Sequence, residues 1–486
     1  MVFNSVSFLI FFTAFFLLYW FVVNKNLKRQ NLLLLAGSYV FYGWADWRFL
    51  SFLIGVSALN FYLGIHIEKA KNPTYKKVLL YIGLLAGIGG LAFFKYYNFF
   101  VTSFKDLFQL LNVNLNLQTL NIIVPLGISF FTFRTISYLL DIDKGKVQST
   151  KDWVVFFNYV SFFPALLAGP IDKARSFIPQ LEKNRFFEYN NAVDGLRQIL
   201  WGLFKKIVIA DNCAYITNNV FGNYESLPAS SLLLGAFLYA IQIYADFSGY
   251  SDMAIGFSRL IGFNVTKNFD FPFFSQNIAE FWQKWHMSLT SWLTEYVFTP
   301  LSIKFRDYDK LGLIFAIVIN FTICGIWHGA NWTYVLFGFL HGCYFIPLIL
   351  KGTINKKKKI AKDRLLPSFR EFINVAMTFS LVMFTFIIFR SETIYQAFHY
   401  FKGLFSLSIF TNPIPPLSLS KLDTLAIVSF ISIMLIIEWL NREKEFGLQI
   451  NYIKQPYFRI GVYYAILFSI LFFGAITSSE FIYFKF

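Results

Sequence analysis

The sequence predicts an all-α polytopic integral membrane protein. Apolar residues make up 56% of the 486-residue chain and charged residues only 14%, whereas an average soluble domain has about 25% charged residues. The 64 phenylalanines exceed what one soluble core can bury, and the mean hydropathy is +0.53. Apolar stretches long enough to cross a bilayer recur along the chain. These observations exclude a soluble globule, a disordered chain and a secreted disulfide scaffold.

Charge and cysteine content narrow the class further. The chain has 43 basic and 27 acidic residues and a net charge of +16. In so apolar a chain, an excess of Lys and Arg indicates loops on the cytoplasmic side of the membrane. We therefore expect no nucleic-acid partner. The three cysteines, Cys213, Cys324 and Cys343, form no C-x-x-C pair. We therefore expect buried, inert thiols and neither a disulfide framework nor a zinc ribbon.

The first 23 residues are nearly all apolar, and no basic residue precedes them. The charges follow, at Lys25, Lys28 and Arg29. A cleavable signal has its basic residues first. The segment is therefore interpreted as a retained helix with its N-terminus outside.

Further apolar stretches continue to the end of the chain, several of them interrupted by Pro and Gly. Pro125, Gly127, Pro164 and Gly169-Pro170 are such interruptions, which are tolerated at membrane depth only beside protein or a wet cavity. We expect about eleven transmembrane helices, with re-entrant and interfacial helices, ringed around a central tunnel in a single domain of residues 1–486. The stretches are 31–45, 50–67, 78–98, 121–140, 153–171, 195–210, 231–246, 312–328, 332–350, 373–389, 424–440 and 460–478.

Basic residues predict the orientation. They concentrate after residue 23, over Lys69–Lys77, in the loop 351–370 and in the segment 441–459, so these four loops are expected in the cytoplasm. Counting spans then puts 267–311 on the cytoplasmic side, and the loop 390–423 and the C-terminus outside. The run Lys356–Lys359 is a topology signal that also attracts anionic lipid. A dedicated site for a soluble acidic partner is the alternative.

The segment 267–311 contains a helical stripe. Phe281, Trp285, Leu289 and Trp292 lie at i, i+4, i+8 and i+11, which predicts an amphipathic helix at the cytoplasmic interface. His286 lies beside this stripe, where a cytosolic donor would arrive. The alternative is an anchoring helix with an incidental histidine.

His328 ends an apolar helix. Helical spacing puts Asn320, Cys324 and Gly325 on its face, and these small neighbours leave room for a substrate. The break at 329–331 frees backbone groups that can orient the ring. Histidine exchanges a proton near neutral pH, as acyl transfer to a hydroxyl requires. A hydrogen-bonded histidine at a helix boundary is the equal alternative.

Other ionisable groups have plainer interpretations. Asp246 and Asp252 lie near a span, and ion pairs with Arg259, Lys205 or Lys206 are favoured over a functional role. His66 and His399 are expected to be interfacial or solvated. Convergence of Cys324, His328, His341 and Cys343 on zinc is disfavoured by their spacing, so no metal is expected. Nucleotide-hydrolase and serine-hydrolase motifs are lacking.

With these residues in place, the chain resembles the membrane-bound O-acyltransferase (MBOAT) family. The resemblance is to the bacterial branch that acetylates alginate or peptidoglycan or transfers D-alanine to teichoic acid. It covers nearly the whole chain. The motifs that carry it are Asn31–Leu35 leading to Ser38–Trp44, Pro125–Phe130, Ala168–Pro170, Gln242–Gly256, Glu280–Leu289 and Trp327–Asn331.

The resemblance implies a tunnel with His328 as the catalytic residue and His286 toward the cytoplasmic side. The remaining residues of the predicted site shape the substrate tunnel: Trp327, Asn331, Asn320, Trp285, Trp282, His341 and Asp246. One departure matters for the donor. Where many relatives have a Pro-Leu-Gly-Gly turn, this chain has Thr299–Arg306, so donor identity is not carried over from any one relative.

The predicted function is transfer of an acyl group, most simply acetyl, from a cytoplasmic thioester to a hydroxyl of a cell-surface polysaccharide or of a periplasmic protein. The donor is acetyl-CoA or an acyl-carrier thioester, with no bound cofactor. Expected partners are the bilayer, a periplasmic SGNH-type acyltransferase or polysaccharide-assembly proteins, and an acyl carrier protein. The expected location is the bacterial cytoplasmic membrane. The alternatives are a transporter or flippase for an acylated or lipid-linked substrate, and a non-catalytic scaffold.

Overall fold

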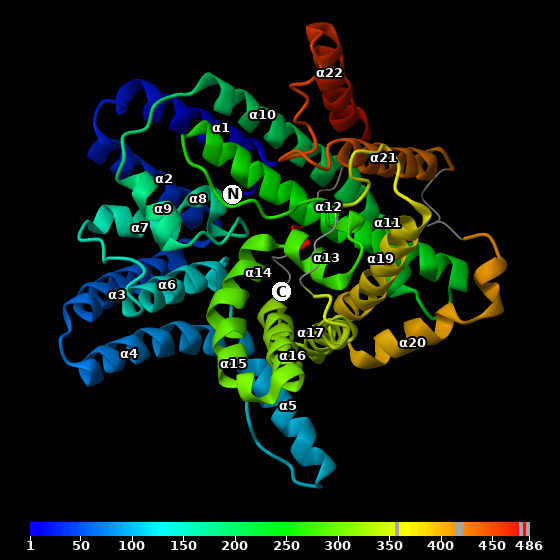
Figure 1. The fold of residues 1–486 in the computed structure, drawn as a ribbon, viewed down its shortest axis with the longest axis horizontal. Coiled ribbons are helices and arrows are strands. Elements are labelled where there is room, and N and C mark those ends of the chain that lie inside the picture. Colours follow the sequence, from blue (N-terminus) through cyan, green and yellow to red (C-terminus); the bar gives the residue numbers. More distant parts are fainter. Residues whose placement is uncertain (355–358, 414–420, 476–479, 483–486) are drawn as a thin grey trace. The chain divides into compact units, whose positions relative to one another are not determined.

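The computed structural model describes residues 1–354, 359–413, 421–475 and 480–482. Over these residues the regular structure is helical throughout, without a strand (Figure 1). The all-α prediction is confirmed. Contacts divide the chain into two compact units. Unit 1 is Met1–Leu196 with Ala254–Thr266, and unit 2 is Arg197–Met253 with Lys267–Phe486.

Four α-helices of unit 1 begin at side-chain caps. The side chains of Ser5, Asn26, Asn72 and Asp152 each accept a hydrogen bond from a backbone N–H of the first helical turn. The helices are α1 (Val6–Leu17), extended by a π-turn over Leu18–Val22, α2 (Leu27–Asp46), α3 (Leu50–Lys69), α4 (Pro73–Leu91), α5 (Tyr97–Leu110), α6 (Ile128–Asp143), α7 (Trp153–Ser161), α8 (Phe163–Leu166) and α9 (Ala174–Leu181). α10 (Tyr189–Leu203) and α12 (Ala229–Leu260) contribute to both units.

The predicted span 121–140 begins too early. The chain is irregular up to Gly127, which has φ 72°, and α6 starts only at Ile128. A Cβ atom at Gly127 would lie 2.7 Å from the carbonyl oxygen of Leu166. Glycine is therefore required both by the left-handed backbone and by the close approach of α8. The Pro-Leu-Gly interruption ends the extended segment instead of kinking a helix.

Unit 2 holds the remaining helices. They are α11 (Asp211–Gly222), which follows a π-helical stretch over Phe204–Ala210, α13 (Ile278–Lys284), α14 (Met287–Leu293), α15 (Thr299–Lys304), α16 (Asp309–His328), α17 (Trp332–Cys343), α18 (Ile346–Leu350), α19 (Phe369–Arg390), α20 (Ile394–Leu404), α21 (Lys421–Leu440) and α22 (Pro456–Phe473).

Eight helical stretches among the described residues are long and apolar enough to cross a membrane. This composition makes the chain a multi-span membrane protein, although the expected number of about eleven spans is not confirmed. Three stretches contain two α-helices each, and the apolar helix Val6–Val22 is shorter than the eight stretches. The eight are Leu27–Lys69, Pro73–Leu110, Ala229–Leu260, Arg306–His328, Trp332–Leu350, Phe369–Arg390, Asp423–Leu440 and Pro456–Phe473.

The prediction of an amphipathic interfacial helix within 267–311 is wrong in two respects. The helix breaks at Trp285 and His286, because His286 adopts a left-handed backbone (φ 45°, ψ 51°) between α13 and α14. The four residues of its apolar stripe are all buried against protein. The aromatic content that suggested a surface helix instead fills the interior of unit 2.

Two predicted loops are only partly described. In 351–370 the residues 355–358, and with them three lysines of the predicted run Lys356–Lys359, lie outside the described part of the chain. The same holds for 414–420 in the loop 390–423, whose first part forms α20.

α16 and α17 cross at a contact made by glycines, and they lie side by side in Figure 1. A Cβ at Gly325 of α16 would lie 2.2 Å from the carbonyl oxygen of Tyr334, and a Cβ at Gly338 of α17 would lie 2.2 Å from that of Phe321. The sequence interpretation that Gly325 leaves room for a substrate is therefore wrong. This glycine is needed for the approach of two helices, and its space is filled by backbone.

Candidate active site

His328 is the last residue of α16 and is buried in unit 2. Its Nε2 atom lies 4.0 Å from the Sγ atom of Cys324, one turn earlier, as the helical spacing predicts. The rings of Phe337 and Phe389 stand edge-on to the imidazole, with centroid distances of 6.0 and 5.2 Å. His328 is thus held in an aromatic surrounding with a small thiol on one side.

A cavity of about 230 Å³ adjoins this histidine through Cys324. Asn320 and Cys324 both line it, so two of the residues predicted on the His328 face open onto one space. Asn320 is 6% exposed, and its Oδ1 atom accepts no hydrogen bond from the residues that the structure describes. Buried amide oxygens normally have a donor, so this atom is available to a ligand N–H or O–H. Trp282, Phe298 and Phe345 contribute apolar walls.

Trp327 joins the two candidate catalytic histidines. Its ring centroid lies 5.0 Å from that of His328 and 5.7 Å from that of His286. The indole therefore contacts both imidazoles, although the sequence separates them by more than forty residues. Trp327 is buried with them. The structure thus brings His286, Trp327 and His328 into one cluster.

Asn268 positions His286. The Asn268 side-chain oxygen lies 3.0 Å from His286 Nδ1 and also accepts hydrogen bonds from the Ser288 N–H and hydroxyl. Its amide nitrogen donates to Ser251 on α12. This pattern makes Nδ1 the protonated nitrogen of His286 and leaves the lone pair on Nε2. Burial lowers the pKa of His286 to about 3, so the ring stays neutral near pH 7.

The left-handed backbone of His286 has a structural cause. Phe247 of α12 meets the imidazole edge-on at 4.6 Å, while the Met287 N–H donates to the Asn268 carbonyl at 2.9 Å. A non-glycine residue with positive φ costs free energy and persists only where surrounding contacts determine it. The break places the ring in the interior of unit 2.

His341 has both ring nitrogens engaged. Trp282 Nε1 donates to His341 Nδ1 at 3.1 Å, and Nε2 lies 3.0 Å from the Thr385 hydroxyl. The Nδ1 atom is therefore an acceptor and Nε2 carries the proton. His341 orients Trp282, a wall of the cavity beside Cys324, and does not itself line that cavity.

The other predicted tunnel residues lie in different surroundings. Asn331 caps α17 by accepting from the Thr333 N–H at 3.0 Å and donates to the Glu392 carbonyl at 2.7 Å. Trp285 packs among aromatic rings, including Phe269 at 5.1 Å. Both residues have structural contacts, and neither lines the cavity beside His328.

Asp246 belongs to an ion-pair network. Its carboxylate lies 2.8 Å from Lys206 Nζ, which lies equally close to Asp211. Its second oxygen accepts from the Ile482 N–H at 2.8 Å. A neighbouring pair joins Asp252 to Lys205 at 2.6 Å. The expected ion pairing of both aspartates is confirmed, with Lys206 and Lys205 as the cations.

A charged pocket of about 400 Å³ lies elsewhere in unit 2. It receives Lys284 from α13, the same helix that gives Ala279, Trp282 and Gln283 to the cavity beside Cys324. Basic residues outnumber acidic ones around it. Its lining is Lys267, Asp270, Phe271, Phe274, Lys284, Lys359, Ile360, Arg442, Glu443, Lys444 and Glu445.

Several site residues were not identifiable from the sequence. Asn268 lies 18 positions before His286 and no local pattern connects them; the same is true of Thr385 and His341. Phe337 and Phe389 are two of 64 phenylalanines. Within the described residues no group of three or more His, Cys, Asp and Glu side chains is placed to hold a metal.

The chain has many membrane-spanning helices and a buried histidine beside an apolar cavity. These features are those of a polytopic membrane enzyme. The chain belongs to the MBOAT family: the family described as MBOAT, membrane-bound O-acyltransferase family, matches residues 148–389. It is therefore an acyltransferase.

Relatives extend the match over most of the chain. It is 34% identical to a probable alginate O-acetylase of Azotobacter vinelandii over 89% of this chain and 83% of the relative. It is 30% identical to a peptidoglycan O-acetyltransferase of Helicobacter pylori over 84% of this chain and 80% of the relative. It is 31% identical to a teichoic acid D-alanyltransferase of Streptococcus thermophilus over 54% of this chain and 68% of the relative. These relatives indicate a multi-span protein of a bacterial membrane that acts in cell-envelope modification.

Proposed function

We propose that this enzyme transfers an acyl group, most simply acetyl, from a cytoplasmic thioester to a hydroxyl on the outer side of the membrane. The observation that carries the proposal is the shared cavity of Asn320 and Cys324, because the Cys324 thiol that lines it lies 4.0 Å from the buried His328. The named relatives acetylate alginate or peptidoglycan or transfer D-alanine. All three names describe transfer of an acyl group to a cell-envelope acceptor.

His328 acts as the general base. It removes the proton of the acceptor hydroxyl as the oxygen attacks the thioester carbonyl, forming a C–O bond. Collapse of the tetrahedral intermediate breaks the C–S bond, and the proton passes from the imidazolium to the leaving thiolate. The aromatic surrounding excludes water, which would otherwise hydrolyse the thioester.

The cavity beside Cys324 suits the arm of the donor. Its walls are mainly apolar, and the unfilled acceptor Oδ1 of Asn320 can take a hydrogen bond from an amide N–H of a pantetheine-type arm. Asn320 then sets the depth at which the thioester carbon reaches His328. Trp282, held by His341, fixes one wall.

The charged pocket suits the phosphate-bearing end of the donor. Its basic residues come from 267–311, 351–370 and 441–459, three segments expected on the cytoplasmic side. α13 supplies residues to both this pocket and the cavity. Acetyl-CoA and an acyl-carrier thioester share this phosphate chemistry, and either fits the proposal.

The acceptor is a hydroxyl of a cell-surface polysaccharide or of a periplasmic SGNH-type partner that completes the transfer. The protein then acts in the bacterial cytoplasmic membrane as one catalytic domain of residues 1–486, with both termini outside. His286, linked to His328 through Trp327, is proposed as a second functional residue. We expect Asn331, Trp285 and Asp246 to support the tunnel through the contacts described above.

His328→Ala and His328→Gln test the proposal in protein purified into lipid nanodiscs and supplied with labelled acetyl-CoA and acceptor. We expect acceptor-dependent release of CoA to fall at least about 100-fold, with unchanged thermal unfolding. His399→Ala is the matched control, because His399 bonds to the Tyr395 carbonyl one turn earlier on its own helix, α20. Undiminished turnover in both His328 variants contradicts the assignment. Acceptor transport without thioester consumption would instead support the transporter alternative.

A further inference from the structure

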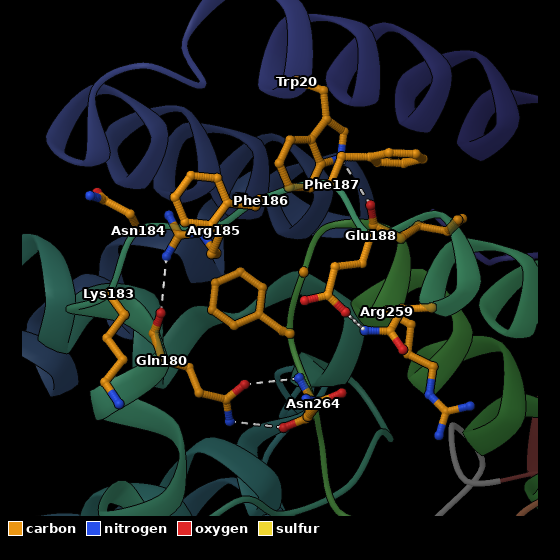
Figure 2. A pocket seen from close by; sticks show the side chains of 14 residues that line it. Trp20, Gln180, Lys183, Asn184, Arg185, Phe186, Phe187, Glu188, Arg259 and Asn264 are labelled. Atoms are coloured by element: carbon orange, nitrogen blue, oxygen red, sulfur yellow. Dashed lines mark hydrogen bonds between the residues drawn. The ribbon is translucent and has the colours of Figure 1, made fainter.

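Unit 1 contains a pocket that acyl transfer does not use. It has a volume of about 250 Å³ and is formed by the end of the first apolar helix, the segment 180–191 and the segment 259–264 (Figure 2). Trp20, Phe187 and Phe263 give it aromatic walls. Its charged lining residues are Lys183, Arg185, Glu188 and Arg259.

The pocket lies at the level where apolar helix gives way to charged residues. Trp20 belongs to the last turn of the apolar helix Val6–Val22, and Lys25 and Lys28 follow within a few residues. Trp20 Nε1 donates to the Leu260 carbonyl at 2.9 Å, which fixes the indole at this end of the helix. Tryptophan concentrates at the headgroup level of membranes. The pocket therefore opens at the depth of lipid headgroups.

A buried arginine gives the wall a fixed positive charge. Arg185 is 7% exposed, its guanidinium donates to the Asn31 side-chain oxygen at 2.6 Å and to the Gln180 carbonyl at 3.2 Å, and it lies 4.8 Å over the Phe263 ring. Its Nε atom donates no hydrogen bond to the described residues. The guanidinium is thus held in place by its ends and adds charge to the pocket.

The remaining polar groups are ordered before any ligand binds. Gln180 bonds to both the N–H and the carbonyl of Asn264 (Figure 2). Glu188 accepts from Asn191 at 2.6 Å, and it is the sole carboxylate of the lining against Lys183, Arg185 and Arg259. The lining therefore has a net positive charge.

Exposed aromatic rings border the charged lining. Phe186 is 76% exposed and Phe187 is 51% exposed. Phe187 packs edge-on against Trp20 at 5.6 Å, whereas Phe186 projects away from the protein core. Large apolar side chains beside cations at this depth are typical of a surface in contact with lipid.

We propose that this pocket binds the phosphate headgroup of an anionic phospholipid, with the acyl chains lying along Phe186 and Phe187. Lys183, Arg185 and Arg259 attract the phosphate. Glu188 can accept a hydrogen bond from a hydroxyl of a glycerol headgroup. A soluble phosphate compound shares the charge preference and gains nothing from the two exposed rings. The site is independent of the proposed acyl transfer.

The test measures lipid retained on the purified full-length chain by native mass spectrometry. The detergent-solubilised protein is titrated with dioleoylphosphatidylglycerol or with dioleoylphosphatidylcholine. The variants are Lys183→Gln, the charge-conserving Lys183→Arg and Phe186→Ser. Lys28→Gln is the matched control, since Lys28 is also exposed and follows the same helix yet does not line the pocket.

We expect the phosphatidylglycerol affinity to fall about fivefold in Lys183→Gln, since the phosphate loses its direct contact with one cation of the pocket lining. Lys183→Arg and Lys28→Gln should retain the affinity of the parent chain, and Phe186→Ser should weaken both lipids. Equal losses in Lys183→Gln and Lys28→Gln, or equal retention of both lipids by the parent chain, overturn the proposal. Displacement of the lipid by inorganic phosphate or acetyl-CoA overturns it in favour of a soluble phosphate ligand.

Discussion

The Nε2 atom of His328 lies 4.0 Å from the Sγ atom of Cys324 on the same face of α16. Because Cys324 also lines the cavity with Asn320, the thiol stands between the proposed base and the proposed route of the donor. This arrangement permits two chemistries. The acyl group passes directly to the acceptor, or it passes first to the thiol.

Cys324→Ala separates these two routes. Direct transfer requires only that the space at this position stays open and does not depend on the thiol. If transfer is direct, we therefore expect the kcat of Cys324→Ala to stay within about threefold of that of the parent enzyme. Cys324→Leu fills the same space and should lower kcat/KM by about tenfold or more, because the thioester no longer reaches His328. A Cys324→Ala enzyme as inactive as His328→Ala would establish a covalent relay through Cys324. Turnover with labelled acetyl-CoA is the measurement.

The Asn268 side-chain oxygen determines the orientation of His286, which gives a second prediction. Asn268→Leu removes the acceptor of His286 Nδ1 and of Ser288, leaving buried donors without partners at a cost of about 1–3 kcal/mol. We expect a lower Tm and a lower kcat together. Asn268→Asp keeps an acceptor oxygen. Compared with Asn268→Leu, it should recover a larger share of the lost kcat than of the lost Tm. An Asn268→Leu enzyme with unchanged kcat would contradict a functional role for His286.

The titration of His286 gives a third prediction. Burial lowers its pKa to about 3, below the usual 6.5, so the ring is neutral in the folded chain throughout pH 5–8. The unfolded chain gains the proton below pH 6.5 and the folded chain only near pH 3. This residue therefore makes the fold less stable as pH falls from 6.5 towards 3, by about 2 kcal/mol at pH 5.

His286→Gln removes that dependence. The drop in Tm between pH 7 and pH 5 should be smaller in His286→Gln than in the parent chain when both are unfolded in the same detergent. An identical drop in the parent chain and in His286→Gln would show that His286 is already protonated at pH 5 in the fold.

The sequence was sufficient for the fold class and for much of the His328 face, because both rest on local periodicity. Apolar stretches predict helices, and the i−4 and i−8 positions of one helix must lie beside His328. It was insufficient where long-range contacts decide. The bond of Asn268 to His286 breaks a helix that the apolar stripe predicts as continuous, and the crossing with α17 takes up the space at Gly325. Neither contact has a signature within one helical window.

The ion pair of Asp246 and Lys206 gives a fourth prediction. Asp246→Asn leaves Lys206 paired with Asp211, whereas Lys206→Met removes the cation that both buried carboxylates share. Removing one partner of a buried pair costs about 3–5 kcal/mol. We therefore expect the larger loss of Tm in Lys206→Met. Asp246→Asn should keep kcat near that of the parent enzyme, and a specific loss of kcat with unchanged Tm would instead place Asp246 in the substrate path.

The crossing of α16 and α17 gives the last prediction. A methyl group at Gly338 would meet the Phe321 carbonyl oxygen at 2.2 Å and Gly325 Cα at 2.9 Å. Both neighbours are backbone, so Gly338→Ala forces the helices apart, at about 1–3 kcal/mol. Because His328 ends α16 and packs on Phe337 of α17, this separation should lower kcat more than donor KM.

Gly461→Ala on α22 is the control for this substitution, since nothing outside its own stretch of helix lies within 4 Å of its added Cβ. It should keep or slightly raise the Tm, because alanine favours helix over glycine by about 1 kcal/mol. Thermal unfolding and turnover are measured for both variants in the same nanodiscs. If Gly338→Ala matched Gly461→Ala in Tm and kcat, α16 and α17 would tolerate separation and the position of His328 would not depend on this contact.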